Sequence, residues 1–344
     1  MSQHYSPMIL RQRAGEALRA LRDSELGHSA EKLFRAAGTR PMLVAAVFAL
    51  GLLGLISIAS AWKSMGTRTQ GLRVVQGTPG HRLIDSAFAG DLATVRAILK
   101  QGKLKPNYQD TRGRTALMAA SEGGHGRVVA ALLSAGADPD KQDSAGWSSL
   151  MGAAGGGHVE CLKMLIGAGA SVNTVNQSGR TALMGAAFGG YAAAVRLLVD
   201  SGADPDKRDK DGWTALRWAS KGNKPRVVQA LLDRGASPNI ADSDGWTTLT
   251  AASLEGHLHV VRALIAGGAR VNARDADGNT ALMTAAFKGH DDVVEALLAA
   301  GAEPRLADKQ GRVAADWARE GAREHSSGAA RRRFKRIRDA ISIS

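Results

Sequence analysis

The sequence of 344 residues contains a single cysteine, Cys161, and aromatic residues make up only 4% of it. One cysteine excludes an intramolecular disulfide, so the fold cannot be a disulfide-stabilised scaffold. The scarcity of aromatics excludes a core built from bulky rings, although 44% of the residues are hydrophobic. With 41 glycines and abundant alanine, the core must consist of small side chains that let short helices pack closely.

Motifs of known catalytic sites are also absent. The sequence has no glycine-rich phosphate loop after a strand, no G-x-S-x-G, no H-E-x-x-H and no C-x-x-C. We therefore predict no catalytic residues, no metal site, no cofactor and no small-molecule substrate. Cys161 is interpreted as a small buried hydrophobic residue.

The net charge of +13 is concentrated in three parts of the chain. Residues 1–41 carry seven basic and four acidic residues, 63–82 carry four basic and none acidic, and 319–340 carry eight basic and three acidic. This leaves about one positive charge for 83–318. Because nucleic-acid affinity comes from neutralising many phosphates, a nearly neutral central region predicts no nucleic-acid partner.

A repeat of 33 residues runs through most of the chain. Its most regular position is a glycine, which recurs without a slip as Gly113, Gly146, Gly179, Gly212, Gly245, Gly278 and Gly311. An Asp or Asn lies three residues before each of these glycines, a spacing typical of a type I turn. Two residues after all but the last comes Thr or Ser, whose hydroxyl can cap a helix N-terminus.

Each unit continues in the same order. A short helix with small residues, such as 115–120, ends near a glycine that suits the left-handed backbone conformation, and Asn223 takes this place in one unit. A second helix follows, as in 128–133, and a Gly-Ala pair closes it. The unit is predicted to be turn, helix, turn, helix and loop.

This pattern resembles the ankyrin repeat. Residues 275–282 (Asp-Ala-Asp-Gly-Asn-Thr-Ala-Leu), followed by Gly289-His290 and Gly301-Ala302, match the family consensus almost position for position. The resemblance implies an all-α ankyrin-repeat solenoid over 79–340, with units that begin near 79, 113, 146, 179, 212, 245, 278 and 311. It also implies a module that binds another protein and is not an enzyme.

Histidine positions differ in part from the family pattern. Where the family has a histidine in the first helix, this chain mostly has methionine, so we expect the family's histidine ladder between repeats to be missing. A second histidine, in the Gly-His pair, is kept in four units and is expected to bond to the neighbouring turn: His125, His158, His257 and His290.

The last unit departs from the repeat pattern and is expected to close the stack. Its second helix, near 327–341, places Phe334, Ile337 and Ile341 on one face and basic residues on the others. This agrees with the need of a terminal repeat to present a polar side to water.

Residues 42–62 form a run of 21 residues without a charge, which is long enough to cross the bilayer as a helix. Arg40 and Lys63 bracket the run, and Trp62 holds an interface position. We therefore predict one transmembrane helix, preceded by a basic, partly helical tail (1–41).

A linker (63–78) is predicted to join this helix to the repeats. Since translocating seven basic residues opposes the positive-inside bias, we expect a cytoplasmic N-terminus and extracytoplasmic repeats. The Ala-, Gly- and Arg-rich composition is typical of a bacterial protein, which would place the chain in the inner membrane.

Release from the membrane is the alternative. Ala59-Ser60-Ala61 has the small-x-small form of a signal-peptidase site, so the chain could be a secreted ankyrin effector freed by cleavage after Ala61. The apolar run exceeds a usual signal core, which favours a retained anchor. A mature chain that begins at Trp62, recovered in the soluble fraction, would support release.

Candidate partner-binding residues follow from their repeat positions. Partners of ankyrin domains usually contact the hairpin tips and the exposed side of the first helices, which form the concave face. Aromatic and arginine side chains, which are enriched at binding hot spots, gather at these positions. They are Trp147, Arg180, Phe188, Trp213, Arg217, Trp218, Lys221, Trp246 and Phe287.

Four of these residues form the strongest expected cluster: Trp213, Arg217, Trp218 and Trp246, from two adjacent units. A partner segment crossing there would meet aromatic faces and fixed positive charge. The competing interpretation is that each tryptophan lies flat on the next hairpin and only packs the solenoid. The predicted function is a membrane-tethered protein that holds a partner, such as an accessory or assembly subunit of a membrane complex.

Overall fold

The computed structural model describes residues 78–324 and 328–343. The predicted tail (1–41), the transmembrane helix (42–62) and nearly all of the linker lie outside the described residues. Within the described ranges, no helix combines the length and hydropathy needed to cross a membrane.

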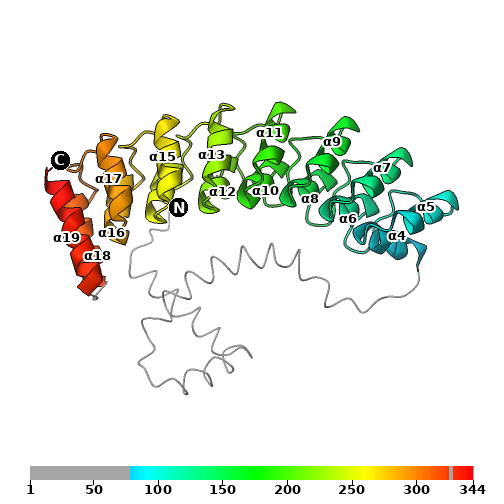
Figure 1. The fold of residues 1–344 in the computed structure, drawn as a ribbon, viewed down its shortest axis with the longest axis horizontal. Coiled ribbons are helices and arrows are strands. Elements are labelled where there is room, and N and C mark those ends of the chain that lie inside the picture. Colours follow the sequence, from blue (N-terminus) through cyan, green and yellow to red (C-terminus); the bar gives the residue numbers. More distant parts are fainter. Residues whose placement is uncertain (1–77, 325–327, 344) are drawn as a thin grey trace, which may run out of the picture. The chain divides into compact units, whose positions relative to one another are not determined.

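The described residues form helical pairs that follow one another in chain order (Figure 1). The helices are α4 (Pro79–Phe88), α5 (Leu92–Lys100), α6 (Ala116–Glu122), α7 (Gly126–Ser134), α8 (Ser149–Gly155), α9 (Val159–Gly167), α10 (Ala182–Gly189), α11 (Ala192–Asp200), α12 (Ala215–Lys221), α13 (Pro225–Leu232), α14 (Thr248–Leu254), α15 (Leu258–Ala266), α16 (Ala281–Lys288), α17 (Asp291–Ala299), α18 (Ala314–Glu324) and α19 (Gly328–Ile343). We number the pairs as units 1 to 8, so unit 5 holds α12 and α13, and unit 6 holds α14 and α15.

Each helix buries its apolar side against its own pair and against the adjacent units. The first helix α6, for example, packs on α4 and α8 as well as on α7. Its residues Ala116, Leu117, Ala119 and Ala120 are almost completely buried, because small side chains allow this close approach. Helices of this length are marginal alone, so their stability comes from the stacking of neighbours.

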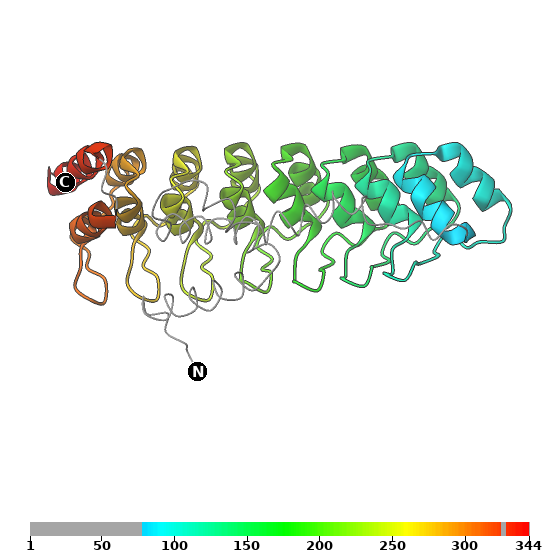
Figure 2. The same ribbon diagram turned by 90° about the horizontal axis from the view of Figure 1, so that it is seen from below.

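The predicted Asx turn is confirmed in every unit from 2 to 8. Asp110 Oδ1 accepts the backbone N–H of Arg112 over 2.8 Å and that of Arg114 over 2.9 Å, and Gly113 has a φ of +73°. The equivalent side chains make the same two bonds: Asp143, Asn176, Asp209, Asp242, Asp275 and Asp308. The loops that carry these turns project on one side of the helices (Figure 2).

The predicted caps of the first helices are also confirmed. In units 2 to 7 the hydroxyl accepts the N–H three residues on, as for Thr181 and Met184 at 3.3 Å. In two units the methionine sulfur accepts the N–H of the capping threonine in return: Met118 from Thr115 and Met283 from Thr280, both over 3.4 Å. Methionine therefore closes the capping box at the position where the family has histidine.

Histidines still link the units, through the Gly-His position. His125 bonds to the carbonyl of Phe88 over 2.8 Å and His158 to that of Glu122 over 3.0 Å. The other two make equivalent bonds, His257 to Ser220 and His290 to Leu254. The expected bond to the neighbouring unit is thus confirmed, and the four histidines link adjacent units although the first helices of units 2 to 8 carry no histidine at the family's position.

A second ladder, made by asparagine side chains and not predicted from the sequence, runs through the loops. Asn173 donates to the carbonyl of Gly202 over 2.9 Å and accepts the N–H of Asp204 over 2.8 Å, one unit further on. Asn107, Asn239 and Asn272 repeat this pair of bonds. These four loops therefore fix the position of the next loop through a side-chain amide, whereas Asp140 and Asp206 accept a backbone N–H of the next loop through a carboxylate.

The last helix, α19, closes the stack as expected. Phe334, Ile337 and Ile341 are buried, whereas Arg332 and Lys335 are exposed. Helix α19 packs against α17 and α18, so its apolar side covers the end of the core.

Most turn glycines are needed for two reasons: their φ is positive, and the backbone of the next unit passes close to them. Two glycines with similar φ, one with such a close neighbour and one without, separate the two effects. A Cβ on Gly146 (φ +80°) would lie 2.9 Å from the backbone of Asn176 in the next unit, whereas one on Gly136 (φ +84°) would meet nothing within 4 Å. We expect Gly136→Ala to cost about 1 kcal/mol for the left-handed conformation, and Gly146→Ala to cost clearly more. Denaturant unfolding of the two variants measures this, and equal losses would contradict it.

Candidate partner-binding site

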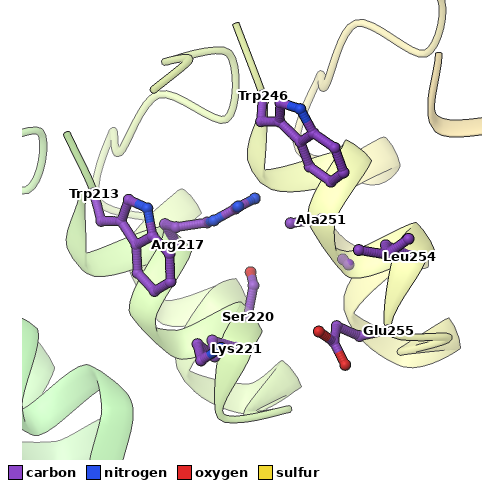
Figure 3. Close-up of a pocket in the computed structure, with 9 residues that line it drawn as sticks. Trp213, Arg217, Ser220, Lys221, Trp246, Ala251, Leu254 and Glu255 are labelled. Carbon is purple, nitrogen blue, oxygen red and sulfur yellow. The ribbon is translucent and has the colours of Figure 1, made fainter. Parts of the chain in front are cut away.

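Two tryptophans occupy corresponding places in units 5 and 6. Trp213 and Trp246 each follow the turn glycine, and their backbone N–H groups donate to Asp209 and Asp242, respectively, over 2.8 Å. Figure 3 shows the two indoles on adjacent units with Arg217 extending between them. Both rings are half-buried. The turns therefore set the spacing of the two indoles.

Arg217 connects the two units. From α12 it donates through Nη1 to the carbonyl of Thr247 over 2.9 Å, and its Nη2 lies 3.8 Å from Asp242 Oδ2. Its guanidinium lies 5.1 Å from the ring centroid of Trp213, within range of a cation–π interaction. Burial lowers the pKa of Arg217, and the charges of Asp242 and Glu255 oppose this shift. An arginine still remains charged at neutral pH.

A pocket of about 100 Å³ opens between these side chains. It is lined by Trp213, Arg217, Ser220, Lys221, Trp246, Ala251, Ala252, Leu254 and Glu255 (Figure 3). Its floor is apolar, and the two exposed charged residues Lys221 and Glu255 stand at the ends of α12 and α14. Cofactor and substrate pockets usually measure about 300–1,000 Å³, so this pocket suits a single inserted side chain.

Trp218 corrects one expectation from the sequence. It was predicted to lie exposed on its first helix, but it is only 2% exposed and its Nε1–H donates to Asp209 Oδ2 over 2.9 Å. Its ring lies 4.9 Å from that of Trp213 and 5.6 Å, edge to face, from that of Phe188 in unit 4. This helix position packs against the preceding unit, so Trp218 supports Trp213 from behind and is not accessible to a partner.

Arg180 belongs to the same support. Its guanidinium lies 4.3 Å from the ring centroid of Trp218, and its Nε lies 3.9 Å from Asp209 Oδ2. That distance is too long for a hydrogen bond, and within the described residues the buried Nε has no hydrogen-bond partner. Arg180 and Phe188 are half-buried and hold Trp218 in place.

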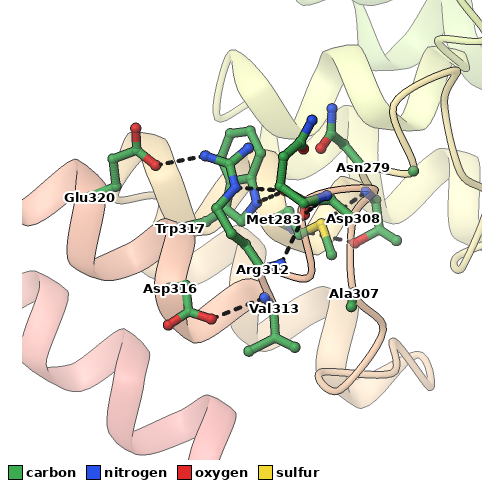
Figure 4. A network of polar contacts seen from close by, with 12 residues as sticks. Asn279, Met283, Ala307, Asp308, Arg312, Val313, Asp316, Trp317 and Glu320 are labelled. Carbon is green, nitrogen blue, oxygen red and sulfur yellow. Dashed lines mark hydrogen bonds and ion pairs between the residues drawn. The ribbon is translucent and has the colours of Figure 1, made fainter.

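A similar arrangement lies three units further on, with its arginine at the position that Trp213 holds in unit 5. Trp317 Nε1–H donates to Asp308 Oδ2 over 3.1 Å, and Phe287 meets the ring of Trp317 edge to face at 5.6 Å. Arg312 donates through Nε to the same carboxylate oxygen over 2.8 Å and lies 4.4 Å from the ring centroid of Trp317 (Figure 4). Phe287 thus belongs to this second cluster and lies outside the pocket.

Asp308 shows the electrostatic effect of such a cluster. Burial tends to raise its pKa, but hydrogen bonds from the backbone and side chain of Arg312 and from Trp317 outweigh this, so the pKa of Asp308 lies below its ordinary value. Trp317 was not among the residues predicted from the sequence. The signal that could have found it is an Asp followed nine residues later by Trp, which occurs at both Asp209 and Asp308.

The nine predicted residues therefore fall into three groups. The structure brings Trp213, Arg217, Lys221 and Trp246 together around the pocket, and places Arg180, Phe188 and Trp218 behind them. The two remaining residues, Trp147 in unit 3 and Phe287 in unit 7, lie apart from the pocket. The pocket residues Leu254 and Glu255 were missed, because their position depends on the adjacent unit.

Among the described residues, no group of three or more His, Cys, Asp and Glu side chains is placed to hold a metal ion. Cys161 is buried, and burial, followed by the charge of Glu160, raises the pKa of its thiol. A thiol in this setting is a poor nucleophile.

Comparisons with known proteins agree with the fold. The family model described as ankyrin repeats (3 copies) matches residues 83–176, 150–242 and 221–308, which together span more than half of the chain. Among solved structures, the chain is similar to the crystal structure of the human ASB11 ankyrin repeat domain. The TM-score is 0.58 and the identity 26%, covering 63% of this chain and 96% of that one. A search of curated proteins found no match.

The two tryptophan–aspartate pairs allow a matched test. Trp218→Phe removes the indole donor to Asp209, whose oxygen then has only Arg180 at 3.9 Å. Trp317→Phe removes the same atoms, but Asp308 keeps its 2.8 Å bond from Arg312. We expect Trp218→Phe to cost about 1–3 kcal/mol of unfolding free energy and Trp317→Phe less. Denaturant titration measures both, and a larger loss for Trp317→Phe would contradict the account.

Proposed function

This chain belongs to the ankyrin-repeat family, and we propose that it is a membrane-tethered protein that holds a partner protein at the pocket between Trp213 and Trp246. Ankyrin repeats imply a protein–protein interaction module. The proposal adds the location of the contact and the tether. It describes an accessory or assembly subunit of a membrane complex.

One observation carries the location of the contact. Two half-buried indoles flank an apolar floor, with the cations of Arg217 and Lys221 beside them. Partly exposed tryptophan and arginine side chains around a concave, apolar spot have the composition of a binding hot spot. The support from Trp218 and Arg180 holds Trp213 in place before a partner arrives, which lowers the entropy lost on binding.

The tether rests on the sequence. Residues 42–62 are uncharged and long enough to span the bilayer, and basic residues flank them. The proposed arrangement is a single span in the inner membrane of a bacterium, with the N-terminus in the cytoplasm and the repeats outside it. Tethering raises the effective concentration toward a membrane-bound partner, so modest affinity is sufficient.

Release by cleavage after Ala61 is the second candidate, favoured by the sequence Ala59-Ser60-Ala61. The released chain would act as a secreted effector on a protein of another cell. Both candidates use the same binding pocket, and they differ in whether the apolar segment is retained.

The contact can be located by site-specific crosslinking in intact cells. A photo-reactive amino acid in place of Lys221, at the exposed end of α12, should capture one dominant protein, whereas the same group in place of Arg226, exposed on α13, should not. Adding Trp246→Ala to the Lys221 variant should reduce capture about thirtyfold, the effect of losing a hot-spot residue. Equal capture from both positions, or capture insensitive to Trp246→Ala, would place the contact elsewhere.

Fractionation tests the tether independently of the partner. We expect the full chain to sediment with membranes after an alkaline wash and deletion of 42–62 to release it, because the apolar run is the proposed anchor. In spheroplasts, added protease should digest the repeats, since these are proposed to be extracytoplasmic. A soluble mature chain that starts at Trp62 would favour the secreted effector, and repeats protected until lysis would reverse the proposed orientation.

A further inference from the structure

We propose that the pocket recognises a partner segment that places an acidic side chain beside a bulky apolar one. This inference rests on the proposed function, and it assigns the chemistry of the partner that the pocket selects. It follows from an unequal distribution of charge and apolar surface between the two units that form the pocket.

The α12 side of the pocket is cationic. The guanidinium of Arg217 has five N–H donors, yet its one hydrogen bond within the described residues goes to the carbonyl of Thr247. Asp242 stands 3.8 Å away, beyond hydrogen-bond distance. Arg217 therefore keeps donors for a further acceptor, and it lines the pocket.

Lys221 adds a second positive charge on the same side. It is exposed at the end of α12, its Nζ lies 5.5 Å from the ring centroid of Trp213, and no carboxylate of the described residues forms an ion pair with it. Arg217 and Lys221 thus both lie next to the indole of Trp213 (Figure 3). A carboxylate entering beside this indole would accept charge-assisted hydrogen bonds from both residues.

The α14 side of the pocket is apolar. Trp246, Ala251 and Leu254 line it, and no cation of the described residues lies over the ring of Trp246. A bulky aliphatic or aromatic side chain would bury its surface here. Because the cationic and apolar sides adjoin, the acidic and apolar residues of the partner must be close together in space.

Glu255 sets the direction in which the segment lies. It is exposed at the end of α14 and forms no ion pair with a described residue. Its negative charge repels a second acidic side chain on the apolar side, so it favours a segment whose acidic residue faces α12. The alternative partner would be a basic segment that stacks on Trp246 and pairs with Glu255. Among the residues that line the pocket, two cations stand against the single carboxylate of Glu255, which disfavours it, although Asp242 outside this lining offsets part of the charge of Arg217.

The test starts from random peptides displayed on phage and selected on the full chain in mild detergent. We expect the enriched peptides to share an acidic residue next to a bulky apolar one. An enriched peptide, synthesised with a fluorescent label, then gives dissociation constants by anisotropy. Enrichment of basic peptides, or of apolar peptides without an acidic residue, would overturn the proposal.

Variants then identify the groups that bind the peptide. Arg217→Gln should weaken binding about tenfold. Lys221→Glu, an exposed change that leaves the core intact, should weaken it about fivefold. Exchanging the acidic residue of the peptide for Lys should restore part of the binding to the Lys221→Glu protein, because Arg217 still repels the lysine. The control Arg226→Glu, on α13, should leave affinity unchanged, whereas Glu255→Gln should tighten binding of peptides with two acidic residues.

Failure of this inference is separable from failure of the proposed function. If the Lys221 position still captures its partner in cells and Trp246→Ala abolishes capture, but Lys221→Glu leaves peptide affinity unchanged, the acidic preference is wrong and the docking site stands. If capture at Lys221 is itself absent, the docking site is wrong. Restoration by the charge-exchanged peptide supports both.

Discussion

In each unit from 2 to 8, the side chain of an Asp or Asn accepts two backbone N–H groups at the start of the hairpin, and the other regular features depend on this turn. The turn holds a glycine at positive φ. In several units the backbone of the next unit lies within about 3 Å of the place that a Cβ on this glycine would occupy. The turn also brings a hydroxyl to the N-terminus of the first helix. Since the same turn recurs every 33 residues, the residue after its glycine occupies an equivalent place in each unit.

Asp209 uses this turn for a second purpose. One carboxylate oxygen holds the backbone of Trp213, and the other accepts the indole N–H of Trp218. A buried carboxylate is costly unless its oxygens have donors, so the pair satisfies both groups at once. Most other units have alanine, glycine or threonine at the position of Trp218. The large ring is accommodated here because its one polar atom is bonded and its faces contact Trp213, Phe188 and Arg180.

The pocket therefore depends on tightly packed side chains beneath it and on charged side chains around it. Trp218 fixes Trp213 from behind, and Arg217 spans the gap to unit 6 through the carbonyl of Thr247. The guanidinium of Arg217 is stabilised by the aromatic face of Trp213 and by the charge of Asp242, but Asp242 lies too far away to accept a hydrogen bond from it. Arg217 therefore retains N–H donors that no described residue accepts from.

The sequence by itself determined the features that arise within one unit. The 33-residue period, the Asx turns, the hydroxyl caps and the apolar face of α19 were all predicted, since each depends on residues a few positions apart. The tertiary structure alone decided which aromatic side chains remain accessible. Trp213 and Trp218 are five positions apart in the same unit, yet one lines the pocket and the other is buried against unit 4. Burial depends on side chains supplied by a neighbouring unit, and a pattern that repeats every 33 residues does not encode how those particular side chains fit together.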